Sequence, residues 1–423
     1  MNAFLKFSPL VAALAIAGCN AGGSPNMPTG GGASQSGPSA SAHIVPEWQA
    51  KHEARRVCKT LAGGVQCQVL VVTKGVKPDC SPSSGSCGWR PIDLQTRYNL
   101  SGSLGKGSGT IVALIELGDL SNAASDLATY RSTFGLGTAT FFKYNETGQQ
   151  SNYPESCQDF GWCVETDLDI QMVSASCPKC TIYLIEGGNC GGVVCGLENA
   201  EATAVKLGAT ILSNSWGCSS LNYGENCGDS NFPNYFSTPG VAYLASSGDD
   251  GYNIILWPAA LANVLAVGGT QLALSGSTYS ETVWDGAGAG CATTTPKPSW
   301  QHDPDCSGKT ISDISAEAGC SPGVAEYISS YGGWTDVCGT SVASPLTAGI
   351  VGLAGNGSSI IGGKTFWKLS TRKHKKELHV ITSGNDGSCS NYLCQAGLSK
   401  KDGGYKTYSG PAGWGSPNGI KAY

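Results

Sequence analysis

The sequence predicts an α/β domain in which a mostly parallel sheet is covered by helices on both faces. Short apolar runs typical of buried strands alternate with longer stretches whose apolar residues recur at helical spacing. The strand candidates lie near 111–117, 181–186, 209–213, 241–246 and 264–268, and the helix candidates near 121–133, 164–176 and 196–207. Such alternation favours parallel strands joined by helical crossovers.

The helix near 164–176 carries two carboxyl groups on one face. Glu165 and Asp169 are four residues apart, so both side chains project from the same side, whereas Asp167 points elsewhere. Like charges at this spacing repel, and a solvated acidic face without a chemical task is the plain alternative. A functional interpretation needs another group within reach of the pair.

A turn after the strand near 241–246 supplies a third carboxyl group. Asp249 follows Ser247-Gly248 at the carboxyl end of this apolar run. In open α/β sheets this edge forms the ligand crevice. The alternative is an ordinary Gly-Asp turn.

The segment from Gly339 to Ser341 supplies a hydroxyl group at the start of a predicted helix. Gly339 allows a tight turn, and Pro345 is tolerated only in a first helical turn. Ser341 would face outward beside free backbone amides, which can stabilise developing negative charge. A capped helix with no catalytic role could have the same letters.

Taken together, Glu165-x-x-x-Asp169, the Asp249 turn and the Ser341 segment resemble the sedolisins, the serine-carboxyl peptidases, in order and separation. The resemblance extends along most of residues 93–423. Further matching blocks are Thr110–Glu116, Ser213–Gly217, Ala266–Thr270, Lys297–Gln301 and Ser312–Ala316. The resemblance implies a subtilisin-like α/β fold, and the cysteine content adds disulfide-rich loops.

The resemblance also implies an acid-active endopeptidase. Ser341 would be the nucleophile that forms an acyl-enzyme, Glu165 its base, and Asp169 the partner with which the base shares or relays a proton. Asp249 would donate a hydrogen bond to the oxyanion, which requires a protonated acid and therefore favours acidic pH.

Substrate binding is expected at Ser215, Trp216 and Gly217. By resemblance these residues form an extended edge against which the substrate backbone pairs as an added strand. Packing of Trp216 in the core is the alternative interpretation.

The histidines do not suggest a histidine base. They stand at positions 43, 52, 302, 374 and 379, and none lies in a glycine-rich motif suited to activating a serine. His374 and His379 fall in a charged run typical of a solvated surface.

No cofactor or metal is expected. The family's C-terminal calcium site has one aspartate before Ile-Thr-Ser-Gly and another before Gly-Pro-x-Gly. Val380 and Ser409 occupy these positions, and the loss of both carboxylate ligands should abolish the site. Asp386 and Asp402 are the nearby carboxylates that could rebuild one.

The N-terminus predicts export. Residues 1–19 read as a signal peptide that ends in a lipobox-like Ile-Ala-Gly-Cys, so Cys19 would be lipidated and the protein anchored in the cell envelope, at the outer membrane. Ordinary signal cleavage, giving a secreted protein, is the alternative. Residues 20–41 form a flexible Gly/Ser/Pro tether. A short Cys-containing segment, 42–90, is too small for the family's prodomain, and 91–423 is the peptidase domain.

The eighteen cysteines after Cys19 predict disulfides, because an even number in an exported chain favours pairing. The spacing suggests pairs of near neighbours, although sequence alone does not fix the connectivity: 58/67, 80/87, 157/163, 177/180, 190/195, 218/227, 291/306, 320/338 and 389/394. Cys177 and Cys180 could instead form half of a zinc site, but no second half-site has matching spacing.

Composition limits the partners. Charged residues make up 13% of the chain and the formal net charge is −5, which argues against nucleic acid or an anionic membrane surface as partner. We expect a monomer that acts on proteins or peptides. A non-catalytic surface-binding lipoprotein on the same fold remains an alternative. A glycosidase is disfavoured, because Glu165 and Asp169 share one helix face and would not flank a sugar.

Overall fold

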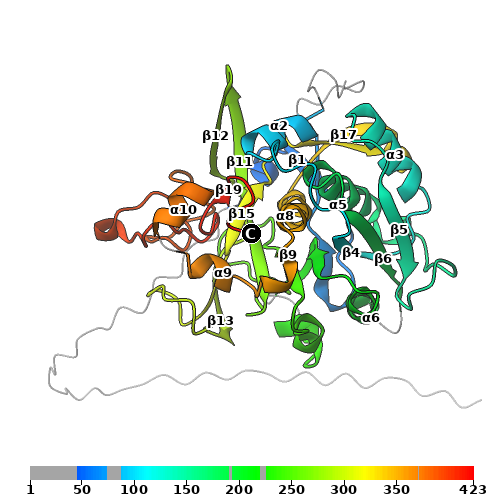
Figure 1. Ribbon diagram of the computed structural model, residues 1–423. Helices are drawn as coiled ribbons and strands as arrows, with labels where there is room; N and C mark the ends of the chain where they lie inside the picture. The colour runs from blue at the N-terminus through cyan, green and yellow to red at the C-terminus, as the bar shows by residue number, and fades with distance from the viewer. Residues whose placement is uncertain (1–44, 74–86, 190–192, 220–224, 370) are drawn as a thin grey trace, which may run out of the picture. The chain divides into compact units, whose positions relative to one another are not determined.

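The computed structural model describes residues 45–73, 87–189, 193–219, 225–369 and 371–423 (Figure 1). The predicted signal peptide, Cys19 and the tether lie outside these residues. No helix in the described part of the chain is both long and apolar enough to cross a membrane.

The centre of the fold is an eight-stranded sheet with the order β12-β11-β9-β7-β4-β6-β5, in which β15 also pairs with β11. Its strands are β4 (Ile111–Leu117), β5 (Thr140–Asn145), β6 (Thr181–Gly187), β7 (Ile211–Asn214), β9 (Ala242–Ser246), β11 (Val264–Ser275), β12 (Thr278–Val283) and β15 (Ile314–Glu317). All pairings are parallel except that of β11 with β12. The predicted parallel sheet is confirmed.

Helices cover both faces of this sheet. The main ones are α3 (Ala123–Thr133), α5 (Cys163–Ser176), α6 (Val193–Lys206) and α8 (Thr340–Ala354). In Figure 1, α5 and α8 lie side by side on one face, and α6 lies on the other. Every residue of α5 is buried, because α8, α3 and the sheet surround it. The carboxyl groups of α5 are therefore held in the interior.

The start of α8 follows the sequence prediction in one respect and departs from it in another. Gly339 has a φ of 115°, a conformation that favours glycine. Pro345 lies in the second turn of α8, not the first. Proline cannot donate to the carbonyl group four residues earlier, that of Ser341. The Ser215 hydroxyl oxygen lies 3.5 Å from this carbonyl oxygen.

The segment before residue 73 is built into the fold through two small sheets. Its elements are α1 (Glu47–Ala50), β1 (Ala54–Arg56), the 3-10 helix η1 (Ala62–Gly64), β2 (Val65–Cys67) and β3 (Leu70–Val72). One sheet has the order β1-β3-β17-β16 and the other β10-β8-β2. In the first of these sheets β3 lies between β1 and β17.

The remaining elements are short. The helices are α2 (Pro91–Arg97), α4 (Cys157–Phe160), α9 (Lys364–Trp367) and α10 (Thr371–Glu377). The strands are β8 (Trp216–Ser219), β10 (Leu256–Trp257), β13 (Gly290–Pro296), β14 (Gly308–Ile311), β16 (Val324–Ile328), β17 (Gly333–Cys338), β18 (Leu378–His379) and β19 (Ser416–Pro417).

Seven of the nine predicted disulfides are present: 58–67, 157–163, 177–180, 218–227, 291–306, 320–338 and 389–394. Cys177–Cys180 is thus a disulfide and not a zinc half-site. Cys87 and Cys195 are also disulfide-bonded, but their predicted partners, Cys80 and Cys190, lie outside the described residues.

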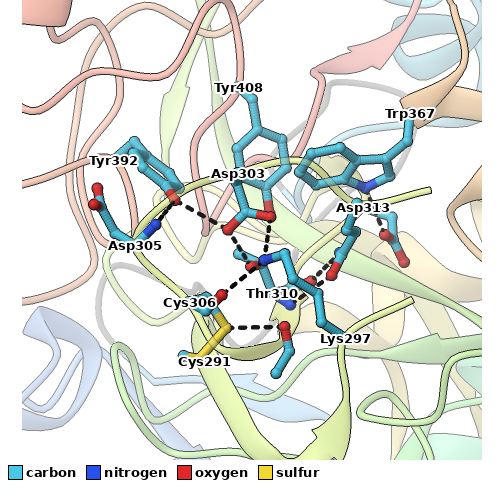
Figure 2. A network of polar contacts seen from close by, with 12 residues as sticks. Cys291, Lys297, Asp303, Asp305, Cys306, Thr310, Asp313, Trp367, Tyr392 and Tyr408 are labelled. Atoms are coloured by element: carbon cyan, nitrogen blue, oxygen red, sulfur yellow. Dashed lines mark hydrogen bonds and ion pairs between the residues drawn. A yellow bond between two sulfur atoms is a disulfide. The ribbon is translucent and has the colours of Figure 1, made fainter. Parts of the chain in front are cut away.

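A polar network joins the C-terminal region to the loop before β14 (Figure 2). At its centre the buried Asp303 accepts hydrogen bonds from Lys297 Nζ at 2.8 Å, Thr310 Oγ1 at 2.6 Å and the Tyr392 hydroxyl at 3.0 Å. The Cys291–Cys306 disulfide lies in the same network. Asp303 is fully satisfied, so we assign the network a structural role.

Candidate active site

Ser341 and Glu165 form the centre of the site. The Ser341 hydroxyl group donates to Glu165 Oε2 at 2.7 Å, and both side chains are 0% exposed. Ser341 is the second residue of α8 and Glu165 the third of α5, and the packing of these two helices brings together residues 176 positions apart. The arrangement is that of a hydroxyl nucleophile and a neighbouring base.

Asp169 extends this contact along α5. Its carboxyl group hydrogen-bonds with that of Glu165 and accepts from the Ser215 hydroxyl group, at 2.7 Å to Oδ1 and 3.0 Å to Oδ2. A hydrogen bond between two carboxyl groups requires a proton on one of them. Glu165 and Asp169 therefore lie beside each other on one face of α5, whereas Asp167 lies close to Asp126.

A fourth carboxyl group, which sequence analysis missed, continues the chain. Glu116 in β4 hydrogen-bonds with Asp169, and the indole of Trp162 donates to Glu116 Oε2 at 2.8 Å. The available signal was a glutamate inside an otherwise apolar strand, since a buried carboxyl group needs a partner. Glu116 thus interacts with Asp169 and with Trp162.

Burial controls the protonation of these acids. It raises the pKa of Glu165, Asp169 and Glu116 well above the ordinary range, and the neighbouring carboxyl groups raise each pKa further. The hydrogen bonds donated by Ser341 and Ser215 act in the opposite direction on Glu165 and Asp169. The cluster therefore retains protons at pH values where exposed carboxyl groups have lost theirs.

Asp249 lies in the turn after β9 and contacts Thr340, the residue before Ser341. Thr340 donates to its Oδ1 from the backbone N–H at 2.8 Å and from the hydroxyl group at 2.9 Å. The amide of Thr340 is thus not free for an oxyanion. Asp249 Oδ2 has no hydrogen-bond partner among the described residues. Burial raises the pKa of Asp249 to about 7, against the lowering effect of Arg56, so at acidic pH Oδ2 can carry a proton to donate.

Gly339 makes room for this carboxyl group. A Cβ atom at Gly339 would lie 2.7 Å from Asp249 Oδ2 and 2.2 Å from the carbonyl oxygen of Gln68. Any larger residue would displace one of them.

The predicted substrate edge is already paired. Trp216 and Gly217 belong to β8, which pairs with β10 on one side and with β2 on the other. The Trp216 side chain is buried against Phe232, with ring centroids 6.1 Å apart. Its side chain therefore packs in the core, while its backbone pairs with β2 and β10.

No described histidine joins the site. His374 was interpreted as part of a solvated surface, and this was wrong: its ring is buried and stacks on Trp414 at 4.0 Å, while Nε2 contacts the Phe366 carbonyl oxygen at 2.7 Å. His379 contacts the Arg97 carbonyl oxygen at 3.0 Å. The apolar partner Trp414 comes from a distant segment, which a local charge pattern could not indicate.

Potential metal ligands are sparse. Within the described residues, Cys58, Cys67 and Glu165 form the one group close enough to hold an ion, but both sulfur atoms are joined in a disulfide and offer no thiolate. Val380 borders a cavity of about 190 Å³, together with Tyr408, and the adjoining Ser409 is buried. Asp386 is buried, whereas Asp402 is exposed.

Comparisons with known proteins agree with this geometry. Residues 161–415 match the subtilase family. Sedolisin from Pseudomonas sp. (strain 101) is 28% identical over 374 residues, covering 78% of this chain and 60% of that protein. Kumamolisin from Bacillus sp. (strain MN-32) is 30% identical over 300 residues, covering 64% and 53%. The chain thus spans less than two thirds of the length of these relatives.

One solved structure of a sedolisin is also similar to this chain. The structure described as Pseudomonas sedolisin (serine-carboxyl proteinase) complexed with two molecules of pseudo-iodotyrostatin is 26% identical and superposes with a TM-score of 0.66. The alignment covers 78% of this chain and 96% of the other.

Proposed function

The chain belongs to the subtilase family, in its sedolisin group, and on this premise we propose that it is a serine-carboxyl endopeptidase that cleaves proteins or peptides at acidic pH. The observation that carries the proposal is the 2.7 Å hydrogen bond from the Ser341 hydroxyl group to Glu165. A carboxyl group here takes the place at which subtilisin-type enzymes use histidine.

In the proposed reaction each of the four residues has its own role. Ser341 Oγ attacks the substrate carbonyl carbon and passes its proton to Glu165, which shares it with Asp169 and later gives it to the leaving amine. Protonated Asp249 donates from Oδ2 to the oxyanion. Water then hydrolyses the ester on Ser341, with Glu165 again as base.

The two alternatives receive less support. A surface-binding lipoprotein would have no need for a hydroxyl group hydrogen-bonded to a buried chain of three carboxyl groups. In a glycosidase the paired carboxyl groups stand apart on opposite sides of the sugar. Here Glu165 and Asp169 hydrogen-bond with each other.

The proposal is tested with a denatured protein as substrate, assayed from pH 3 to 8 after incubation at each pH until activity is constant. We expect an acidic optimum, and a loss of at least about 10⁴-fold in kcat for Ser341→Ala and Glu165→Gln, because each change breaks the nucleophile–base unit. Asp167→Asn is the matched control, since this buried carboxyl group on the same helix faces Asp126. A neutral optimum, or near wild-type turnover by either site variant, would contradict the proposal.

We further propose that the protein is exported and anchored through lipidated Cys19, acting as a monomer. Seven disulfides among the described residues support an oxidising compartment. Mass spectrometry of the mature N-terminus distinguishes a diacylglyceryl cysteine from an unmodified cleavage site.

A further inference from the structure

Positive charge is unevenly distributed along the chain. Residues 360–385 hold six lysine and arginine residues and one acid, Glu377, whereas the whole chain holds 26 basic and 31 acidic residues. The composition of the whole chain, which argued against an anionic membrane surface as partner, averages over this difference. A local excess of basic residues points to a partner of opposite charge.

Helix α10 carries most of this charge on its exposed side. His374 is the buried residue of this helix, and its ring stacks on Trp414. Arg372 lies two positions before His374 and Lys376 two positions after it, so with about 3.6 residues per turn both point away from the buried side. Lys375 flanks them, and all three basic side chains are exposed.

An aromatic cluster fixes the basic segments relative to one another. Trp367 of α9 packs against Tyr408 and Trp414, with ring centroids 4.7 Å and 5.2 Å apart, and Trp414 also contacts the buried side of α10. The end of α10 is held by Asn418, whose Nδ2 donates to the Lys376 carbonyl oxygen at 3.2 Å. The backbone that carries these charges is therefore held in one arrangement.

Two further basic side chains border α10. Lys368 directly follows α9 and is exposed. Burial lowers the pKa of His374, and the positive charge of Lys406 lowers it further, so Lys406 lies near α10. Five exposed side chains of this region form what we call the basic face: Lys368, Arg372, Lys375, Lys376 and Lys406.

The basic face has no carboxyl partner within the part of the chain that the structure describes. None of its five side chains forms an ion pair there, whereas Arg97, Lys143 and Lys297 each pair with a carboxyl group. Arg372 and Lys376 are also four positions apart on one helix, a spacing at which like charges repel. The folded protein therefore bears a small electrostatic cost at this face, which an anionic partner would remove.

The chemistry of the region favours a lipid surface over nucleic acid. Ile361, in the turn before α9, is 46% exposed, and basic residues beside an exposed apolar side chain are typical of proteins that lie on a membrane. Single-stranded nucleic acid is usually held by aromatic rings as well, but the exposed rings among the described residues, Phe142 and Tyr331, lie outside this region. The disulfides also favour an oxidising compartment, away from cellular nucleic acid.

We propose that the basic face docks on an anionic phospholipid surface. The ammonium and guanidinium groups pair with lipid phosphates, and Ile361 enters the layer between the headgroups. In Figure 1, α10 lies at the left of the view and α5 to the right of the centre, so the face is separate from the catalytic residues of α5. Together with the proposed lipid on Cys19, docking would determine which side of the domain faces the membrane.

The test uses the full chain with Ser341→Ala, which cannot digest itself, and Cys19→Ser, which cannot be lipidated. Binding is measured at pH 7 by sedimentation with vesicles of phosphatidylglycerol and phosphatidylcholine, and with vesicles of phosphatidylcholine alone. We expect binding to the anionic vesicles to be at least about tenfold tighter. Raising the salt concentration from about 0.05 M to about 0.5 M should abolish this difference, because salt screens the charges.

Two triple variants of this chain locate the binding surface. Replacing Arg372, Lys375 and Lys376 by glutamine should weaken binding to the anionic vesicles about 100-fold, since each basic residue near such a surface contributes about fivefold. The control variant removes the same charge from three exposed lysines elsewhere and should bind like the unaltered chain: Lys106→Gln, Lys179→Gln and Lys206→Gln. Both triple variants should keep their melting temperature and, with Ser341 restored, their activity on a denatured protein.

Equal weakening in the two triple variants, or equal binding to neutral and anionic vesicles, would overturn the inference. Tighter binding to a double-stranded DNA fragment than to anionic vesicles at the same salt would assign the face to nucleic acid and overturn it as well. If the first triple variant does not fold, Lys376→Gln alone decides, with an expected loss of about fivefold. The peptidase proposal is tested separately, with a soluble substrate, and stands or falls independently of these outcomes.

Discussion

At the scale of single residues, the chemistry of this site depends on where protons reside. Sequence analysis singled out Ser341, Glu165, Asp169 and Asp249, because their motifs taken together resemble those of the sedolisins, and the structure places Ser341 against Glu165. Sequence analysis did not identify Glu116, because its partner Asp169 is 53 positions away and comes close only when β4 packs against α5. Contacts between residues so far apart in the sequence become visible only in the folded structure.

Asp249 should set the alkaline limit of activity. Its pKa of about 7 means that the donor proton is present at acidic pH and is lost as the pH rises through that value. Asp249→Asn keeps an N–H donor that does not titrate, so we expect the alkaline limb of the kcat–pH profile to shift to higher pH. The maximal kcat should be lower, because the geometry of the donor changes. An alkaline limb that stays near pH 7 in the variant would assign this ionisation to another group.

Glu116 should act through its neighbours. Its charge raises the pKa of Glu165, and its carboxyl group hydrogen-bonds with Asp169. In Glu116→Gln we expect kcat to fall by about 10-fold to 100-fold, and the acidic limb, where Glu165 must lose its proton to act as base, to shift to lower pH. A purely structural role would lower stability without moving that limb, so the pH profile and the melting curve are measured together.

At the scale of elements, the regular strands and helices were predictable and the irregular ones were not. The strands near 111–117 and 181–186 and the helix near 164–176 carry long apolar patterns, which local sequence can display. In contrast, β2 and β3 have three residues each and exist through pairing with β8 and β17. Such non-local pairings have no signature within a three-residue run.

Disulfides, Cys389–Cys394 in the C-terminal loop among them, should stabilise the folded protein in place of a bound ion. Without aspartates at Val380 and Ser409, we expect a chelator to leave the melting temperature of Ser341→Ala unchanged. A reductant should lower it, since the 18-residue separation of Cys320 and Cys338 alone corresponds to about 3 kcal/mol of loop-closure stabilisation. Melting that drops with chelator and recovers with calcium would show that Asp386, Asp402 or backbone carbonyls still bind the ion.

At the scale of the whole molecule, several buried acids among the described residues have raised pKa values. Burial raises the pKa of Glu201 and Asp336 to about 8 and that of Glu326 well above the ordinary range. Among the described residues, no side chain or backbone group donates a hydrogen bond of normal geometry to the carboxyl oxygens of Glu326 and Glu201. These groups fold as neutral acids, so the folded state binds more protons than the unfolded chain between about pH 4 and pH 8.

Stability should therefore fall as the pH rises. A carboxyl group whose pKa is raised by folding contributes stability that is complete below its unfolded pKa and is lost as the pH rises through the folded value. A tenfold difference in proton affinity between the folded and the unfolded chain corresponds to about 1.4 kcal/mol. We expect the melting temperature of Ser341→Ala, which cannot digest itself, to be higher at pH 4 than at pH 8 in calorimetry. Glu201→Gln removes one such acid on α6, away from Ser341. This variant should have a smaller difference in melting temperature between pH 4 and pH 8, because its melting temperature rises more at pH 8 than at pH 4. A melting temperature that increases from pH 4 to pH 8 would instead mean that these acids are ionised in the folded protein, and the proton-sharing chain at Ser341 would then lose its physical basis.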